Sequence, residues 1–174
     1  LRDLLYRRTV TVLSEAQALC GSAATTNNCR QLVNAGRARS QGVEVEAEYT
    51  HGAWNTFANA TYVDSEVLEN AFAPASVGKR LIGVPQWVAN AGVTYTEGTV
   101  SATAVARYAG KVFRNDDNGD RFSGVYGSQD ARTLVDLKAS WRFHRHAAAS
   151  LAIDNLFDRE YFDFFRGPGR SIFG

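Results

Sequence analysis

Polar and apolar residues alternate strictly over long stretches of this chain. In Gly42–Thr50, GVEVEAEYT, the glutamates Glu44, Glu46 and Glu48 are separated by valine, alanine and tyrosine. A period of two residues predicts a β-strand that has one polar and one apolar face. In a soluble sheet the valines would face a protein core. In a membrane barrel they would face lipid, and the glutamates would line a wet interior.

The same alternation recurs along the chain and predicts about eight antiparallel strands, the last of them incomplete. The expected strands cover residues 2–13, 42–50, 54–62, 87–96, 100–108, 132–143 and 151–157, and a last strand begins in GRSIFG. Tight turns are expected at Thr50–Trp54, Thr96–Thr99 and His144–Ala147. Long polar connections are expected at residues 14–28, 65–78, 115–130 and 158–168. Short turns at one end of a sheet and long loops at the other are typical of outer-membrane barrels.

Strand length and aromatic placement favour the membrane interpretation over a soluble antiparallel sheet. Strands of soluble proteins have about 5–6 residues, whereas a bilayer crossing needs about 9–11. Several alternations here persist for about ten residues, with alanine and valine in the middle of the apolar face. Tyr49, Trp54, Tyr95 and Trp141 lie close to the tight turns, where an aromatic girdle would meet the membrane interface.

Composition changes this picture little. The 174 residues include 19 Lys and Arg and 18 Asp and Glu, so the chain lacks the basic excess of a nucleic-acid-binding surface. No apolar stretch approaches the ~18 residues of a transmembrane helix, and the first residues have no signal-peptide core. Alternation would hide a barrel from both tests. The chain has no Met and begins inside a predicted strand, so we expect a fragment of a longer protein.

Three segments resemble the carboxy-terminal barrel strands of TonB-dependent outer-membrane receptors. They are NAGRARSQGVEVEAEY (Asn34–Tyr49), VGKRLIGVPQWVANAGVTY (Val77–Tyr95) and LAIDNLFDREYFDFFRGPGRSIFG (Leu151–Gly174). The third is the most specific, because a strand ending in Asn-Leu-Phe-Asp, an aromatic pair and Pro-Gly-Arg precede the final strand in that family. The residues that match here are Asn155, Leu156, Phe157, Asp158, Tyr161, Phe162, Pro168, Gly169 and Arg170.

The resemblance implies an all-β transmembrane barrel in the outer membrane of a Gram-negative bacterium. Such receptors are similar in having 22 strands and an amino-terminal plug, and they import ferric siderophores, haem or cobalamin with energy delivered through TonB. Residues 1–174 would supply about eight carboxy-terminal strands, without the plug, the TonB-contacting segment and the earlier strands. The implied partners are outer-membrane lipid, the plug, TonB and the cargo, and no nucleic acid.

Two long connections contain candidate functional residues. Cys20 and Cys29 lie in the first, where a disulfide would suit an extracellular or periplasmic setting, and two free thiols are the alternative. RNDDNGDRF (Arg114–Phe122) only weakly resembles a calcium loop, because it begins with Arg and lacks the final Glu. We expect a solvated loop there. Its Arg114 and Arg121, with Tyr126, are candidates for binding an anionic, aromatic-rich chelate by charge and stacking.

Charges of both signs are predicted on the inner face of the barrel, where they would pair across the wall or contact the plug. They are Glu44, Glu46, Glu48, Arg107, Asp136, Lys138 and Arg142. His144 and His146 have the spacing of metal ligands but no third ligand nearby in the sequence, so a solvated turn is the prediction. No catalytic motif, metal site or cofactor site is predicted. A passive porin and a soluble β-sheet binding protein remain alternatives.

Overall fold

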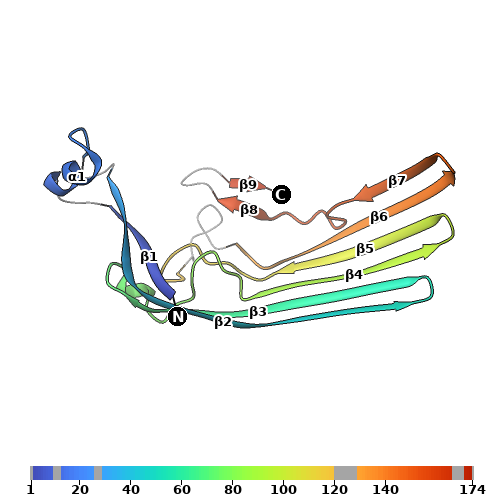
Figure 1. Cartoon of the computed structure of the whole chain (residues 1–174), viewed down its shortest axis with the longest axis horizontal. Helices are drawn as coiled ribbons and strands as arrows, with labels where there is room; N and C mark the ends of the chain where they lie inside the picture. The colour runs from blue at the N-terminus through green and yellow to red at the C-terminus, as the bar shows by residue number, and fades with distance from the viewer. Residues whose placement is uncertain (1, 10–12, 26–28, 120–128, 166–170, 174) are drawn as a thin grey trace.

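The computed structural model of the chain describes residues 2–9, 13–25, 29–119, 129–165 and 171–173, and these residues form an almost entirely β structure (Figure 1). The elements, in chain order, are β1 (Arg2–Thr9), α1 (Leu13–Cys20), β2 (Arg30–His51), β3 (Trp54–Asn70), the 3-10 turn η1 (Pro74–Ser76), β4 (Trp87–Glu97), β5 (Val100–Ala109), β6 (Arg132–His144), β7 (Ala147–Ile153), β8 (Phe162–Phe165) and β9 (Ser171–Phe173).

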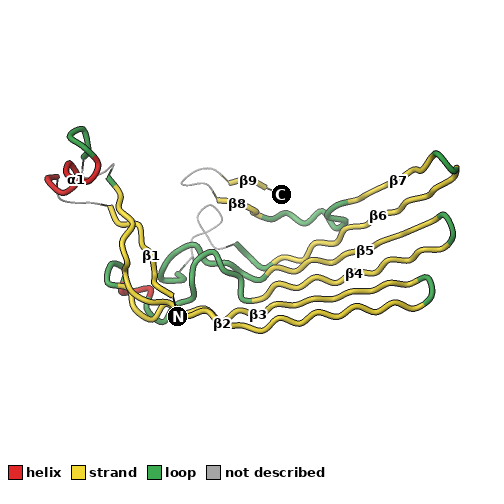
Figure 2. The backbone as a smooth tube through the Cα atoms, viewed as in Figure 1, coloured by secondary structure: helices red, strands yellow, loops and turns green. Residues whose placement is uncertain are grey.

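Strands β1 to β7 form one antiparallel sheet in which every strand pairs with its neighbours in the chain. Strands β8 and β9 pair with each other in a separate two-stranded sheet (Figure 2). The predicted all-β, antiparallel fold is confirmed. The described residues contain nine strands rather than about eight, because the connection predicted at 158–168 contains β8.

The three predicted tight turns are confirmed, and each has two residues between its strands. Gly52 and Gly98 occupy the first turn position with φ of 57° and 58°. A positive φ there fits a hairpin turn whose twist matches that of the strands, and glycine adopts it without a steric penalty. Figure 1 shows the three turns at one end of the sheet and the long connections at the other.

Strands β2 and β3 are longer than predicted, with 22 and 17 residues. Beyond Val43 the face that carries the valines continues with charged residues, so the apolar signal ends although the strand does not. Arg39 pairs with Glu66 at 2.8 Å, and Arg37 is hydrogen-bonded to Glu69. That hydrogen bond lowers the pKa of Glu69. The connection predicted to begin at residue 65 therefore begins only after Asn70.

Two further sequence predictions were wrong. Residues 14–28 were predicted to be a long polar connection without a helix or strand of its own, but Leu13–Cys20 form helix α1. The sequence of α1 is rich in the strong helix formers Leu, Ala, Glu and Gln. Leu13, assigned to the first strand, therefore begins a helix. Phe157 was assigned to a strand, but β7 ends at Ile153 and Phe157 lies in the turn that follows.

The sheet leaves its apolar face uncovered. Val43 is 63% exposed and Leu151 is 66% exposed. Most other large apolar residues of this face are exposed too. The chain has an accessible surface of 12212 Å², whereas a compact soluble protein of this mass would have roughly 8,400 Å². The excess is expected for a sheet that forms a single layer and has no second layer over its apolar face.

Aromatic pairs bound the apolar band along β3 and β4. Trp54 contacts Tyr95 with ring centroids 4.7 Å apart, and Tyr62 contacts Trp87 at 4.8 Å. Trp54 and Tyr62 are eight residues apart on β3, which corresponds to about 26 Å along the strand. This length suits the ~25 Å apolar band of outer-membrane barrels. The described residues contain no helix that is long and apolar enough to cross a membrane.

Candidate functional site

The strand register brings the predicted inner-face charges onto one face of the sheet. Directly opposite residues of paired strands point to the same side, so the pairs can be followed from strand to strand. They are Glu44 with Thr61, Glu46 with Asn59, Asn59 with Asn90, Asn90 with Arg107, Thr103 with Lys138, and Val105 with Asp136. Glu48 and Arg142 continue the same face on β2 and β6. This polar face lies opposite the exposed valines.

Acidic residues on β2 have few partners. Asn55 donates a hydrogen bond to Glu48 at 2.8 Å. Glu44 and Glu46 are exposed and have no hydrogen-bond or ion-pair partner among the residues that the structure describes. With a strand repeat of about 6.8 Å between alternate residues, their carboxylates form an acidic row that is open to a cationic partner.

One pair of charges on β5 and β6 is joined within the sheet, whereas Lys138 and Arg142 on β6 have no ion-pair partner among the described residues. Arg107 contacts Asp136 at 2.6 Å, and the Asp136 side chain is only 20% exposed. Between the acidic row and this ion pair, Asn90 donates to Asn59 at 2.9 Å and the hydroxyls of Thr94 and Thr103 are 3.0 Å apart. The centre of the polar face is therefore hydrogen-bonded and ion-paired, whereas Glu44 and Glu46 on β2 and Lys138 and Arg142 on β6 have no ion-pair partner among the described residues.

Asn155 has a structural role that the sequence analysis did not assign. Its backbone N–H donates to Asp136 at 2.9 Å. Its side chain accepts from the N–H of Arg159 at 2.9 Å and donates to the carbonyl of Arg159 at 3.0 Å. Its φ of 52° lies in the left-handed region, which asparagine tolerates better than most residues. The Asn-Leu-Phe-Asp motif is thus a turn fixed to β6, and asparagine after a strand was the available signal.

Phe57 is an aromatic residue on the mostly polar face, and no pattern in the sequence pointed to it. A Cβ atom on Gly92, opposite Phe57, would lie 2.3 Å from Cε1 of the ring. The missing side chain of Gly92 therefore makes room for the ring. The pairing of an aromatic residue with glycine could have been found only from the strand register, which the sequence does not specify.

Cys20 and Cys29, which are nine positions apart in the chain, form a disulfide. Cys29 and Ala16 are fully buried, and they form a small core with Ala24, which is 7% exposed. The bond therefore holds α1 against the end of its own connection, at the end of the sheet that carries the long loops (Figure 1). The pairing is the one predicted from the sequence.

The predicted ligand-binding residues are only partly described. Arg114 is partly buried, and Arg121 and Tyr126 lie outside the described residues. Asn118 links two connections, because it accepts from the backbone N–H of Arg80 at 2.8 Å and donates to its carbonyl at 3.0 Å. The described residues contain no group of three or more His, Cys, Asp or Glu that could hold a metal ion.

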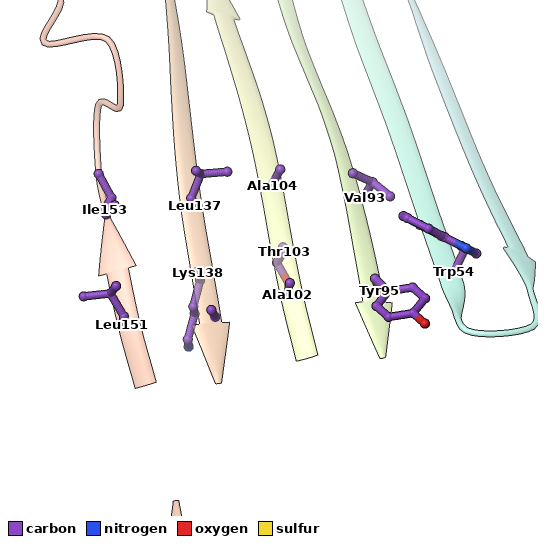
Figure 3. Close-up of a pocket in the computed structure, with 11 residues that line it drawn as sticks. Trp54, Val93, Tyr95, Ala102, Thr103, Ala104, Leu137, Lys138, Leu151 and Ile153 are labelled. Atoms are coloured by element: carbon purple, nitrogen blue, oxygen red, sulfur yellow. The ribbon is translucent and has the colours of Figure 1, made fainter. Parts of the chain in front are cut away.

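A broad hollow lies on the apolar face of the sheet. It has a volume of about 560 Å³ and lies between Trp54 and Tyr95 on one side and Leu151 and Ile153 on the other (Figure 3). Alanines of β5 and β6, including Ala102, form its floor. Most of the residues that line it are apolar, so the hollow is continuous with the exposed apolar face.

Comparison with known proteins identifies one family. The family model described as TonB dependent receptor-like, beta-barrel, matches residues 4–156. A comparison with curated protein sequences found no match.

Several solved structures share the fold. The ferric yersiniabactin uptake receptor FyuA from Yersinia pestis is 23% identical, with 82% of this chain and 22% of that chain covered and a TM-score of 0.68. The ferric preacinetobactin receptor BauA from Acinetobacter baumannii is 18% identical, with 98% and 24% covered and a TM-score of 0.65. The copper transporter OprC is 26% identical, with 78% and 20% covered and a TM-score of 0.57. This chain spans less than a quarter of each.

Proposed function

Because the chain belongs to the TonB-dependent receptor-like β-barrel family, we propose that it is part of the barrel wall of an outer-membrane receptor for active uptake of a metal chelate. The observation that carries the proposal is the pair of opposed faces, one apolar and exposed, the other mostly polar and hydrogen-bonded in its centre. A barrel that separates lipid from an aqueous interior needs this arrangement.

The proposed location is the outer membrane of a Gram-negative bacterium. There, lipid would cover the valines and alanines of the outward face, and the aromatic pairs would lie at the two interfaces. The tight turns would face the periplasm and the long connections the exterior. Cell fractionation of the full-length protein tests this location, and we expect the protein to be recovered in the outer-membrane fraction. Recovery in the soluble fraction would support a soluble binding protein.

The polar face is proposed to face a plug domain. Glu44 and Glu46 supply carboxylates without partners in the described residues, and cationic side chains of a plug would complement them. Arg107, Asp136, Lys138 and Arg142 would complete the inner surface, with the Arg107–Asp136 pair stiffening the wall. TonB would act on the plug and not on this part of the barrel.

The cargo is proposed to be a ferric siderophore or a similar metal chelate, with haem and cobalamin as other candidates of the family. The similar structures are named for ferric yersiniabactin, ferric preacinetobactin and copper, which supports a metal cargo without choosing one. Arg114, Arg121 and Tyr126, in the connection after β5, are proposed to contact an anionic chelate.

Growth of an iron-limited bacterium that carries the full-length receptor tests the transport proposal. Single ferric chelates, including ferric citrate and ferric yersiniabactin, would be supplied with and without TonB. We expect that at least one chelate restores growth only when TonB is present. Growth that persists without TonB would indicate a passive porin, and growth on none of the chelates would contradict uptake of ferric cargo.

A further inference from the structure

Two cations share one aromatic ring at the end of the sheet that carries the long connections. The guanidinium carbon of Arg80 lies 5.3 Å from the ring centroid of Phe113, and Nζ of Lys111 lies 5.1 Å from the same centroid. Each distance is within the range of a cation–π contact. No carboxylate of a described residue pairs with Arg80 or Lys111, so neither positive charge has an ion-pair partner in that part of the chain.

The side chain of Arg80 also has unmet hydrogen-bonding capacity. Its Nε and Nη2 are buried and have no acceptor among the described residues. A buried guanidinium without an acceptor is costly, because its lost hydration is not replaced. The ring of Phe113 compensates for part of the charge but accepts no conventional hydrogen bond from these nitrogens.

The backbone around this cluster is well fixed. Asn118 bonds to both the N–H and the carbonyl of Arg80, and the N–H of Gly83 donates to the carbonyl of Phe113 at 2.9 Å. The two connections that carry the cations are therefore joined to each other. The unmet guanidinium is therefore held in place by its backbone, and an acceptor from outside these residues would satisfy it.

We propose that Arg80, Lys111 and Phe113 form a binding site for the carboxylate or phosphate group of a soluble anion. The proposal rests on the proposed function in one respect, since the anionic group of the cargo would be the natural occupant. Arg80 supplies hydrogen-bond donors, Lys111 a second positive charge, and Phe113 a surface against which both cations are held. Nε and Nη2 are covered, so the connections must part slightly when the anion enters.

The position of the cluster favours a soluble anion over a lipid headgroup. The N–H of Gly110 donates to the carbonyl of Trp87 at 2.8 Å, so Lys111 follows directly on the aromatic level that bounds the apolar band. The N–H of Leu81, next to Arg80, reaches the hydroxyl of Ser65 at 3.3 Å. Ser65 pairs with Ser40 and lies on the same face of β3 as the polar-face residues. The segment that contains Arg80 and Leu81 therefore lies toward the polar side of the sheet.

Binding of citrate to the full-length receptor tests the site. Citrate would be titrated into the purified, detergent-solubilised protein by calorimetry, and amide exchange of residues 79–83 and 111–119 would be followed in parallel. Arg80→Gln removes the charge, and Arg145→Gln removes an exposed charge from a tight turn at the other end of the sheet. Arg80→Lys keeps the charge and reports whether loss of binding follows loss of folding.

We expect citrate to bind the unaltered receptor and Arg145→Gln equally, and to bind Arg80→Gln at least about tenfold more weakly. Arg80→Lys should bind citrate with an affinity between those of the unaltered receptor and Arg80→Gln, because lysine keeps the charge but lacks the Nε and Nη2 donors. Amide exchange should change only in the two named segments. Absence of citrate binding to the unaltered receptor, or equal binding by Arg80→Gln, would overturn the proposal. Displacement of citrate by lipopolysaccharide would also overturn it, because the site would then be a headgroup site.

The outcome is separable from that of the transport proposal. If citrate binding depends on Arg80 while growth on ferric chelates does not depend on TonB, the anion site stands and the transport proposal fails. If growth depends on TonB while Arg80→Gln binds citrate normally, only the anion site fails.

Discussion

Replacing Gly42 by alanine should destabilise the barrel more than the same change at Gly92, although both glycines lie on the polar face. A Cβ atom on Gly42 would lie 2.2 Å from the carbonyl oxygen of Tyr62, and one on Gly92 would lie 2.3 Å from Cε1 of Phe57. Ordinary contact begins at 3.4 Å, so each obstacle must move by 1.1–1.2 Å. The difference lies in what must move.

The obstacle to Gly42→Ala is backbone. Tyr62 pairs with Val43, and the N–H of its neighbour Val63 donates to the carbonyl of Gln86 at 2.8 Å, so neighbours hold this part of β3 on both edges. Overpacking against such a fixed atom costs about 1–3 kcal/mol. The obstacle to Gly92→Ala is the end of a side chain that can rotate, at a cost of about 0.5–1.5 kcal/mol.

Urea unfolding of the full-length receptor in lipid vesicles, followed by tryptophan fluorescence, would measure both changes. A second substitution, Phe57→Leu, should remove most of the cost of Gly92→Ala and none of the cost of Gly42→Ala. Equal destabilisation by the two alanines, or rescue of Gly42→Ala by Phe57→Leu, would refute the reasoning.

Three further predictions concern the turn after β7, the first connection and the extension of β2. Asn155→Ala should cost about 1–2 kcal/mol in the same unfolding assay, because two side-chain hydrogen bonds are lost and alanine adopts the left-handed backbone conformation of this position less readily than asparagine. An unchanged unfolding midpoint would contradict this. Reduction of the bond between Cys20 and Cys29 removes a loop constraint of about 2–3 kcal/mol. Limited proteolysis should therefore cut the first connection faster when a reductant is added, and Cys20→Ser should be cut at that faster rate with or without the reductant. Glu69 has a lowered pKa through its hydrogen bond from Arg37, so its contribution to stability is present above the ordinary pKa of 4.5 and is lost as the pH falls below it. Proteolysis of the ends of β2 and β3 that contain Arg37 and Glu69 should therefore become faster at low pH, and Glu69→Gln should remove that pH dependence.

Alternation predicted the sheet because the two media on its faces differ along the whole apolar band. Where the medium changes, the pattern changes with it. Past Val43 the outward face carries Arg39 and Arg37, which pair with Glu66 and Glu69, so β2 and β3 continue without an apolar signal. Helix α1 was missed because its eight residues are stabilised by a disulfide and a few buried neighbours, which periodicity does not report.

The candidate site divides in a similar way. The inner-face charges were predicted because they occupy alternate positions in their strands. Their partners were not, because the contact between Arg107 and Asp136 depends on the register of β5 against β6. Arg80 and Phe113 come together through the Asn118 bonds between two connections, and no local pattern in the sequence links residues that lie so far apart.

The direction of the two faces is the central claim, and accessibility of adjacent labels on β2 tests it most directly. Cys20 and Cys29 are joined in a disulfide, so a single new cysteine in this part of the chain can carry a spin label. In the full-length receptor in lipid vesicles, a label at Val45→Cys should collide with oxygen dissolved in the bilayer and be shielded from a water-soluble nickel chelate. A label at Glu46→Cys should be shielded from bilayer oxygen. The reverse order, or equal access of both labels to the nickel chelate, would contradict the account.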